Sequence, residues 1–133
     1  MKHKRYERIG EDLYVGQLNN GRTIHVVTKP GFRLSYAFFA TNSGGAHRRF
    51  SLGGVMHDTP AGVAHFLEHK MFDMPDGDNA LSVLSSNGAQ PNAFTSSGMT
   101  AYFFDCTSGF EENLRMLLKF VSTPYFTQET VDK

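Results

Sequence analysis

The sequence has no tryptophan and a single cysteine, Cys106, so it carries no mark of a secreted scaffold held together by disulfides. Its 13 basic and 13 acidic side chains cancel, which gives no electrostatic reason to expect nucleic acid as a partner. No segment approaches the roughly 18 consecutive apolar residues of a spanning helix, and no apolar run follows the basic start as a signal peptide requires. We therefore expect no nucleic-acid or membrane partner, and a reducing, cytoplasmic location.

Phenylalanine, by contrast, is abundant, with 12 residues that can build an aromatic core. The 133 residues suit one compact domain and are too few for two. We interpret residues 1–11 as a solvated basic tail and residues 12–133 as the domain. Strand-like and helix-like segments are mixed, which predicts an α+β fold: an antiparallel-rich β-sheet with helices packed on one face.

Turn signals separate the segments with strand character. Residues 12–29 predict a β-hairpin, because Asn19-Asn20-Gly21 tolerates the positive φ of a tight turn. Residues 34–41 are apolar on both faces, which indicates a central position in the sheet. Further strands are expected at residues 49–52, 90–96 and 100–106.

Helix signals fall between and after these strands. Thr59-Pro60 suits the start of a helix that runs to about Phe72, because threonine caps well and proline fits the first helical position. A second helix is expected at about residues 80–86, ending at Asn87-Gly88.

The C-terminal part predicts two more helices. Ser108 and Glu111 have the spacing of a capping box at the start of the first. Its core-facing stripe is expected to hold Phe110, Leu114, Leu117, Leu118 and Val121. Thr127 then caps a last helix that stops within about a turn, at Lys133. Natural domains rarely end on a first turn, so we expect this chain to be a fragment.

The segment with the clearest chemistry is His65-x-x-Glu68-His69, inside the first predicted helix. Residues four apart on a helix are offset by only about 40°, so both imidazoles project to one side and can reach one ion. The alternative is a pair of ordinary exposed histidines beside a solvated glutamate. A chance match is expected in about one sequence in a few hundred of this length, which favours the metal site.

These residue types suit zinc chemistry. Zn²⁺ binds neutral imidazole well, and a catalytic site uses three protein ligands and one water, whose pKa the metal lowers to about 7. A carboxylate that is not a ligand then takes the proton from this zinc-activated water as it attacks a peptide carbonyl, and passes it to the leaving amine. Glu68 is placed for this general-base role.

The motif and its flanks resemble a known family. His-x-x-Glu-His marks the inverted zinc peptidases. Residues 62–72 resemble the active-site helix of the pitrilysin/insulinase/mitochondrial-processing-peptidase family, residues 87–96 and 100–104 its strand pair, and residues 124–133 its next helix. The sequence motifs HFLEHKMF, NAFTS and PYFT are together most similar to those of a branch of bacterial cytoplasmic insulinase-like proteins. The resemblance covers nearly the whole chain, from about Leu13 onward.

The resemblance implies the N-terminal part of a metallopeptidase-like catalytic domain, truncated at its C-terminal end. The implied activity is zinc-dependent endopeptidase cleavage of peptides or unfolded segments. His65 and His69 would be the zinc ligands and Glu68 the base. Asn92 and Ala93 would lie on an edge strand that pairs with the extended peptide substrate, although Asn92 could equally be an ordinary strand residue.

The family's third zinc ligand is a glutamate expected beyond Lys133, on the helix that begins near Thr127. The missing partner would be the remaining C-terminal part of the same protein or a homologous subunit. We therefore expect the 133-residue chain to bind Zn²⁺ weakly and to be weakly active or inactive.

Two alternatives from other classes stay open. One is a non-catalytic peptide-binding or structural subunit of a peptidase complex, although the intact motif favours an enzyme. The other is a structural zinc domain, which is disfavoured because the chain has no cysteine pair. The remaining candidates match no functional position of the family, so we expect Cys106 in the core and the rest at the surface or in structural roles: His25, His47 and His57.

Overall fold

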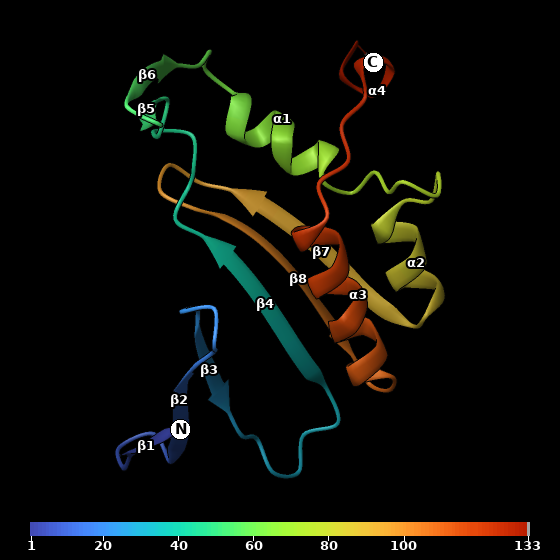
Figure 1. The fold of residues 1–133 in the computed structure, drawn as a ribbon. Helices are drawn as coiled ribbons and strands as arrows, with labels where there is room; N and C mark the ends of the chain where they lie inside the picture. Colours follow the sequence, from blue (N-terminus) through green and yellow to red (C-terminus); the bar gives the residue numbers. More distant parts are fainter. Residues whose placement is uncertain (133) are drawn as a thin grey trace. The chain divides into compact units, whose positions relative to one another are not determined.

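The structure is a computed structural model that describes residues 1–132 (Figure 1). The chain forms two compact units, Met1–Arg33 and Leu34–Lys133. The strands are β1 (Lys2–Tyr6), β2 (Glu11–Gln17), β3 (Thr23–Val27), β4 (Ser35–Thr41), β5 (Arg49–Leu52), β6 (Val55–Asp58), β7 (Ala89–Thr95) and β8 (Thr100–Cys106). The helices are α1 (Val63–Lys70), α2 (Ala80–Ser86), α3 (Phe110–Ser122) and α4 (Gln128–Asp132).

The first unit is a three-stranded antiparallel sheet in the order β1-β2-β3. The predicted hairpin of β2 and β3 is confirmed, and Gly21 supplies the positive φ of its turn. The structure differs from the expected tail at residues 1–11, because β1 pairs with β2. Cross-strand contacts accompany the pairing: His3 and Arg5 both bond the Asp12 carboxylate and hold the pKa of that carboxyl below its usual value. The assignment of residues 12–133 to a catalytic domain stays a prediction.

The larger unit is built on an antiparallel sheet in the order β4-β8-β7. All three strands were predicted, but the expected central position of residues 34–41 is wrong: β8 is central, and within residues 1–132 β4 pairs with β8 alone. The apolar side chains on the second face of β4 have another explanation. Tyr36 and Phe38 remain about half exposed and pack against Phe103 on the face of the sheet away from the core.

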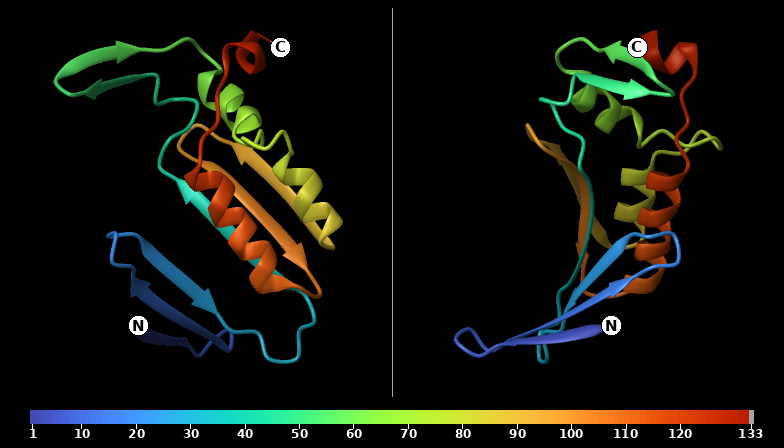
Figure 2. Two further views of the ribbon diagram at one scale, coloured as in Figure 1. Left: turned by 45° about the vertical axis from the view of Figure 1, so that its right-hand side comes forward. Right: turned by 60° about the vertical axis from the view of Figure 1, so that its left-hand side comes forward.

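The core lies between the sheet and helices on its other face (Figure 2). Phe72 and Phe120 each meet the ring of Tyr102 edge to face, with centroids 5.6 Å apart in both pairs. Leu84 of α2 and Phe104 of β8 are 0–1% exposed, and burying side chains of this size stabilises the fold by about 1.5–3 kcal/mol each. The predicted α+β class, with helices on one face of an antiparallel sheet, is confirmed.

Two predicted helix starts are wrong, for related reasons. Thr59 does not cap α1, because its N–H and its hydroxyl both donate to the carbonyl of Arg48, at 2.9 Å each. The helix begins instead after Gly62, which has a φ of 90°. At α3, Gly109 occupies the N-cap with a φ of 66° and no side-chain cap bond forms, so the capping box is absent.

The other helix signals hold. The α2 helix matches its prediction, with the Asn79 side chain accepting from the N–H of Leu81. Thr127 caps α4 through a 3.2 Å bond from the N–H of Thr130, while Lys133, at the end of the expected helix, lies outside the described residues. Strand β6 was missed, although Gly53-Gly54 forms its turn with β5. None of the helices within residues 1–132 combines the length and apolar character needed to cross a membrane.

Candidate metal centre

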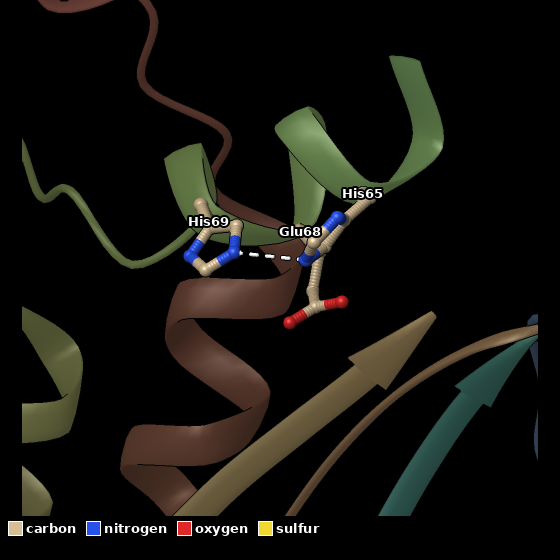
Figure 3. A group of neighbouring side chains, drawn as sticks. All are labelled: His65, Glu68 and His69. Atoms are coloured by element: carbon tan, nitrogen blue, oxygen red, sulfur yellow. Dashed lines mark hydrogen bonds between the residues drawn. The ribbon is translucent and has the colours of Figure 1, made fainter. Parts of the chain in front are cut away.

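Helix α1 brings His65 and His69 together on its exposed side. Their Nε2 atoms lie 3.0 Å apart and their ring centroids 4.7 Å apart (Figure 3). Together with Glu68 they offer donor atoms that all lie within 4.8 Å of one another, and no other such group occurs in the described part of the chain. The predicted motif residues therefore meet in space.

The two imidazoles fit a zinc ion. Nitrogens bound to one Zn²⁺ at about 2.1 Å in tetrahedral geometry lie about 3.4 Å apart, a few tenths of an ångström more than the observed 3.0 Å. Both rings are exposed, so an ion can reach them without unfolding the helix. Neutral imidazole is also among the ligands that zinc prefers.

Glu68 differs from its histidine neighbours in burial and direction. It is 6% exposed, and its side chain points from α1 toward the sheet (Figure 3). The hydroxyl of Thr95 on β7 donates to Oε2 of Glu68 at 2.6 Å. Thr100 of β8 lies beside Thr95 and donates its own hydroxyl proton to the carbonyl of Ser43 at 2.8 Å. The carboxylate is thus held at the junction of α1 with the sheet.

Tyr102 forms part of the same junction. It lies on the inner face of β8 with 5% of its surface exposed, and burial, assisted by the negative charge of Glu68, raises its pKa to about 12. The phenol is therefore neutral over the ordinary pH range.

Two pockets meet at Glu68. The first, of about 420 Å³, is lined in part by the histidine pair and by strand β7 from Pro91 to Thr95. The second, of about 270 Å³, is mainly apolar and lies on the other side of the carboxylate, next to Leu67, Met71, Tyr102, Val121 and Phe126. A molecule in the first pocket would contact both the candidate metal ligands and the edge of the sheet.

Asn92 and Ala93, the predicted substrate contacts, line this first pocket. Strand β7 forms an edge of its sheet among the described residues. The N–H of Ser96 donates to the carbonyl of Met99, so alternation along the strand turns the N–H of Ala93 away from β8. The side-chain oxygen of Asn92 accepts this N–H at 2.8 Å.

Sequence reasoning missed Thr95 and Tyr102 as neighbours of Glu68. A signal for Thr95 was available, since it lies two positions from Ala93 and therefore shares its face of the strand. The expectation for Cys106 is confirmed, because it is 2% exposed within the core. His25 and His57 lie exposed on strands, and Nδ1 of His47 accepts the N–H of Gly44 in a loop.

Comparison with known proteins defines the class. Residues 52–133 match the model of the insulinase family, peptidase family M16, so the chain belongs to this family, as the resemblance predicted. The chain is 47% identical over 130 residues to an uncharacterized zinc protease of Bacillus subtilis, YmfH. This match covers 96% of this chain and 30% of that protein. It is 36% identical over 77 residues, 54% of this chain and 8% of the other, to the A-factor-processing enzyme of Saccharomyces cerevisiae.

Solved structures agree. An M16-like peptidase from Alicyclobacillus acidocaldarius superposes with a TM-score of 0.86 and 35% identity, over 92% of this chain and 29% of the other. Pitrilysin superposes with a TM-score of 0.75 over 95% of this chain and 13% of the other; at 17% identity, this likeness supports the fold alone. The chain spans about 30% of the length of the Bacillus relative.

Proposed function

We propose that this chain is the zinc-binding part of a longer endopeptidase, in which His65 and His69 hold Zn²⁺ and Glu68 is the general base. The observation that carries the proposal is the geometry on α1. Two imidazole nitrogens lie 3.0 Å apart beside a buried carboxylate, at a pocket that also contains an edge strand. Membership of the insulinase family supports the same reading.

The chemistry divides between the ion and the chain. When bound, zinc lowers the pKa of a water to about 7 and polarises a peptide carbonyl. Glu68 accepts the proton of the water as its oxygen attacks the carbonyl carbon, and then delivers a proton to the nitrogen of the leaving amine. The exposed histidines would set the position of the ion, and the buried carboxylate of Glu68 lies next to them.

The proposed substrate is a peptide or an unfolded segment in extended form. It would lie along the free edge of β7, where main-chain hydrogen bonds give affinity with little dependence on sequence. Asn92 and Ala93 would contact it, after the Asn92 side chain releases the N–H that it now covers. The third zinc ligand would come from beyond Lys133, in the rest of a cytoplasmic protein or in a homologous subunit.

The direct test is Glu68→Gln in the complete protein that carries this chain. Glutamine keeps the shape of the side chain but cannot accept the proton, so we expect kcat/KM for an internally quenched peptide to fall about 10²- to 10⁴-fold. Zinc affinity should stay near that of the parent. Glu111→Gln is the matched control, since Glu111 is exposed on α3 and pairs only with Arg115 among the described contacts.

Cleavage by Glu68→Gln at the parent's rate would contradict the proposed base. A parent protein that binds the peptide without cleaving it, with zinc present, would instead favour the non-catalytic peptide-binding subunit.

A further inference from the structure

We propose that Thr95 is a positioning residue for Glu68: its hydroxyl anchors one carboxylate oxygen and aims the other at the water. The inference rests on the proposed role of Glu68 as the base. It starts from the 2.6 Å bond between Thr95 Oγ1 and Glu68 Oε2, which joins residues 27 positions apart in the chain. This length is typical of a charge-assisted O–H···O⁻ bond, at about 2.5–2.7 Å.

The direction of this bond follows from the neighbouring hydroxyl. Thr100 donates its single hydroxyl proton to the carbonyl of Ser43 at 2.8 Å, so it has none to give to Thr95. Thr95 has two acceptors in reach, Glu68 Oε2 at 2.6 Å and Thr100 Oγ1 at 3.4 Å. The shorter and charged partner takes the proton. Thr95 is thereby a committed donor to Glu68.

The anchor itself is held in place. Thr95 ends β7, and Thr100 begins β8 directly opposite it. The turn between them bonds to the loop after β4, where the N–H groups of Gly45 and Ala46 donate to the carbonyls of Ser96 and Ser97 at 2.8 and 3.0 Å. A rigid hydroxyl therefore meets a long side chain with several rotatable bonds. The bond restricts the rotamers of Glu68 and, in the proposed mechanism, leaves Oε1 as the oxygen that receives the proton.

The test uses Thr95→Val in the complete protein. Valine keeps the β-branched shape that suits a strand and removes only the hydroxyl. We expect kcat for an internally quenched peptide to fall about 10- to 100-fold, as is typical when a supporting partner of a site residue is removed. The KM and the zinc affinity should stay near the parent's values. Thr107→Val, one residue beyond the far end of β8, is the control expected to leave kcat unchanged.

Two further variants keep the test decisive if Thr95→Val does not fold. Thr95→Ser retains the hydroxyl and Thr95→Ala lacks it, so the ratio of their kcat values isolates the hydroxyl. We expect Thr95→Ser to restore most of the parent's kcat, which a purely packing role for the methyl group would not allow.

Glu68→Gln, made in parallel, separates the two proposals. If Glu68→Gln is inactive while Thr95→Val or Thr95→Ala keeps the parent's kcat, the positioning role is overturned and the base assignment stands. If both fall and Thr95→Ser recovers, the positioning role is supported. If Glu68→Gln cleaves normally, both proposals fall together.

Discussion

At the scale of single residues, Gly44 is the point where the backbone of the loop after β4 packs closely against the turn that follows Thr95. A Cβ at this position would lie 2.3 Å from the carbonyl oxygen of Ser96 and 2.6 Å from the nitrogen of Met99, both backbone atoms that cannot turn aside. We expect Gly44→Ala to lower the free energy of unfolding by about 1–3 kcal/mol, measured by chemical denaturation.

Gly45→Ala is the matched control one position along. Its Cβ would lie 3.8 Å from the same Ser96 oxygen, an ordinary contact, so the change is expected to stay within about 0.5 kcal/mol. Equal denaturation midpoints for the two variants would contradict the close approach of the backbones at Gly44.

Single residues also divide into those that the sequence could identify and those that it could not. His65, Glu68 and His69 are neighbours through helical periodicity alone, so their spacing predicted their meeting. Thr95 reaches Glu68 only because α1 packs on the sheet, and no local pattern encodes that contact across 27 positions. The substitutions above test the roles of Glu68 and Thr95.

At the scale of elements, local turn chemistry was a reliable guide, whereas capping residues predicted the start of α4 but not the starts of α1 and α3. The strands between residues 11 and 27 and between residues 89 and 106 follow from alternation and from residues that favour turns. Thr59 and Ser108 have the chemistry of caps, but Thr59 is bound to Arg48, and glycines with positive φ occupy both N-cap positions. At Thr59, the contact with Arg48 overrode a local capping preference of about 1 kcal/mol.

Helix α3 shows the same limit of periodicity and provides a sharp comparison. The predicted core stripe included Leu117 and Leu118 alike, yet the structure leaves Leu117 1% exposed and Leu118 45% exposed. We expect Leu117→Ala to destabilise the fold by about 2–5 kcal/mol in chemical denaturation, because it opens a cavity in the core.

Leu118→Ala on the same helix should cost less than about 1 kcal/mol, since the truncated side chain is already half in water. A loss for Leu118→Ala as large as that for Leu117→Ala would mean that this face of α3 is covered in the complete protein.

At the scale of the whole molecule, metal binding reports how much of the site this chain carries. We expect the complete protein to bind Zn²⁺ tightly and the 133-residue chain to bind it weakly, because two imidazoles are one ligand short of a catalytic zinc site. Competition with a zinc-sensitive dye measures both affinities. His65→Ala should abolish binding by the short chain, while His57→Ala, an exposed histidine that stacks on Phe50, should leave it unchanged.

Tight one-to-one binding by the short chain would contradict this prediction. It would mean that a third ligand lies within residues 1–133 or comes from a second copy.

The arrangement of strands was beyond the reach of the sequence. The class of fold followed from the mixture of elements, but the order β4-β8-β7 depends on pairs such as Ala37 with Phe104, which are far apart in the chain. Apolar side chains on both faces of β4 predicted burial by two neighbouring strands. The same pattern arises when one face meets the core and the other carries the aromatic contacts of Tyr36 and Phe38.

The bond between Asn92 and the N–H of Ala93 also changes what the edge strand offers to other extended chains. A bare sheet edge is a template for any extended segment, including those of misfolded neighbours and of other copies. To form a hydrogen bond with the N–H of Ala93, an incoming segment must first displace the side-chain oxygen of Asn92, which stays tethered one residue away. A single asparagine thus covers a hydrogen-bond donor that the edge of the sheet would otherwise offer to another strand.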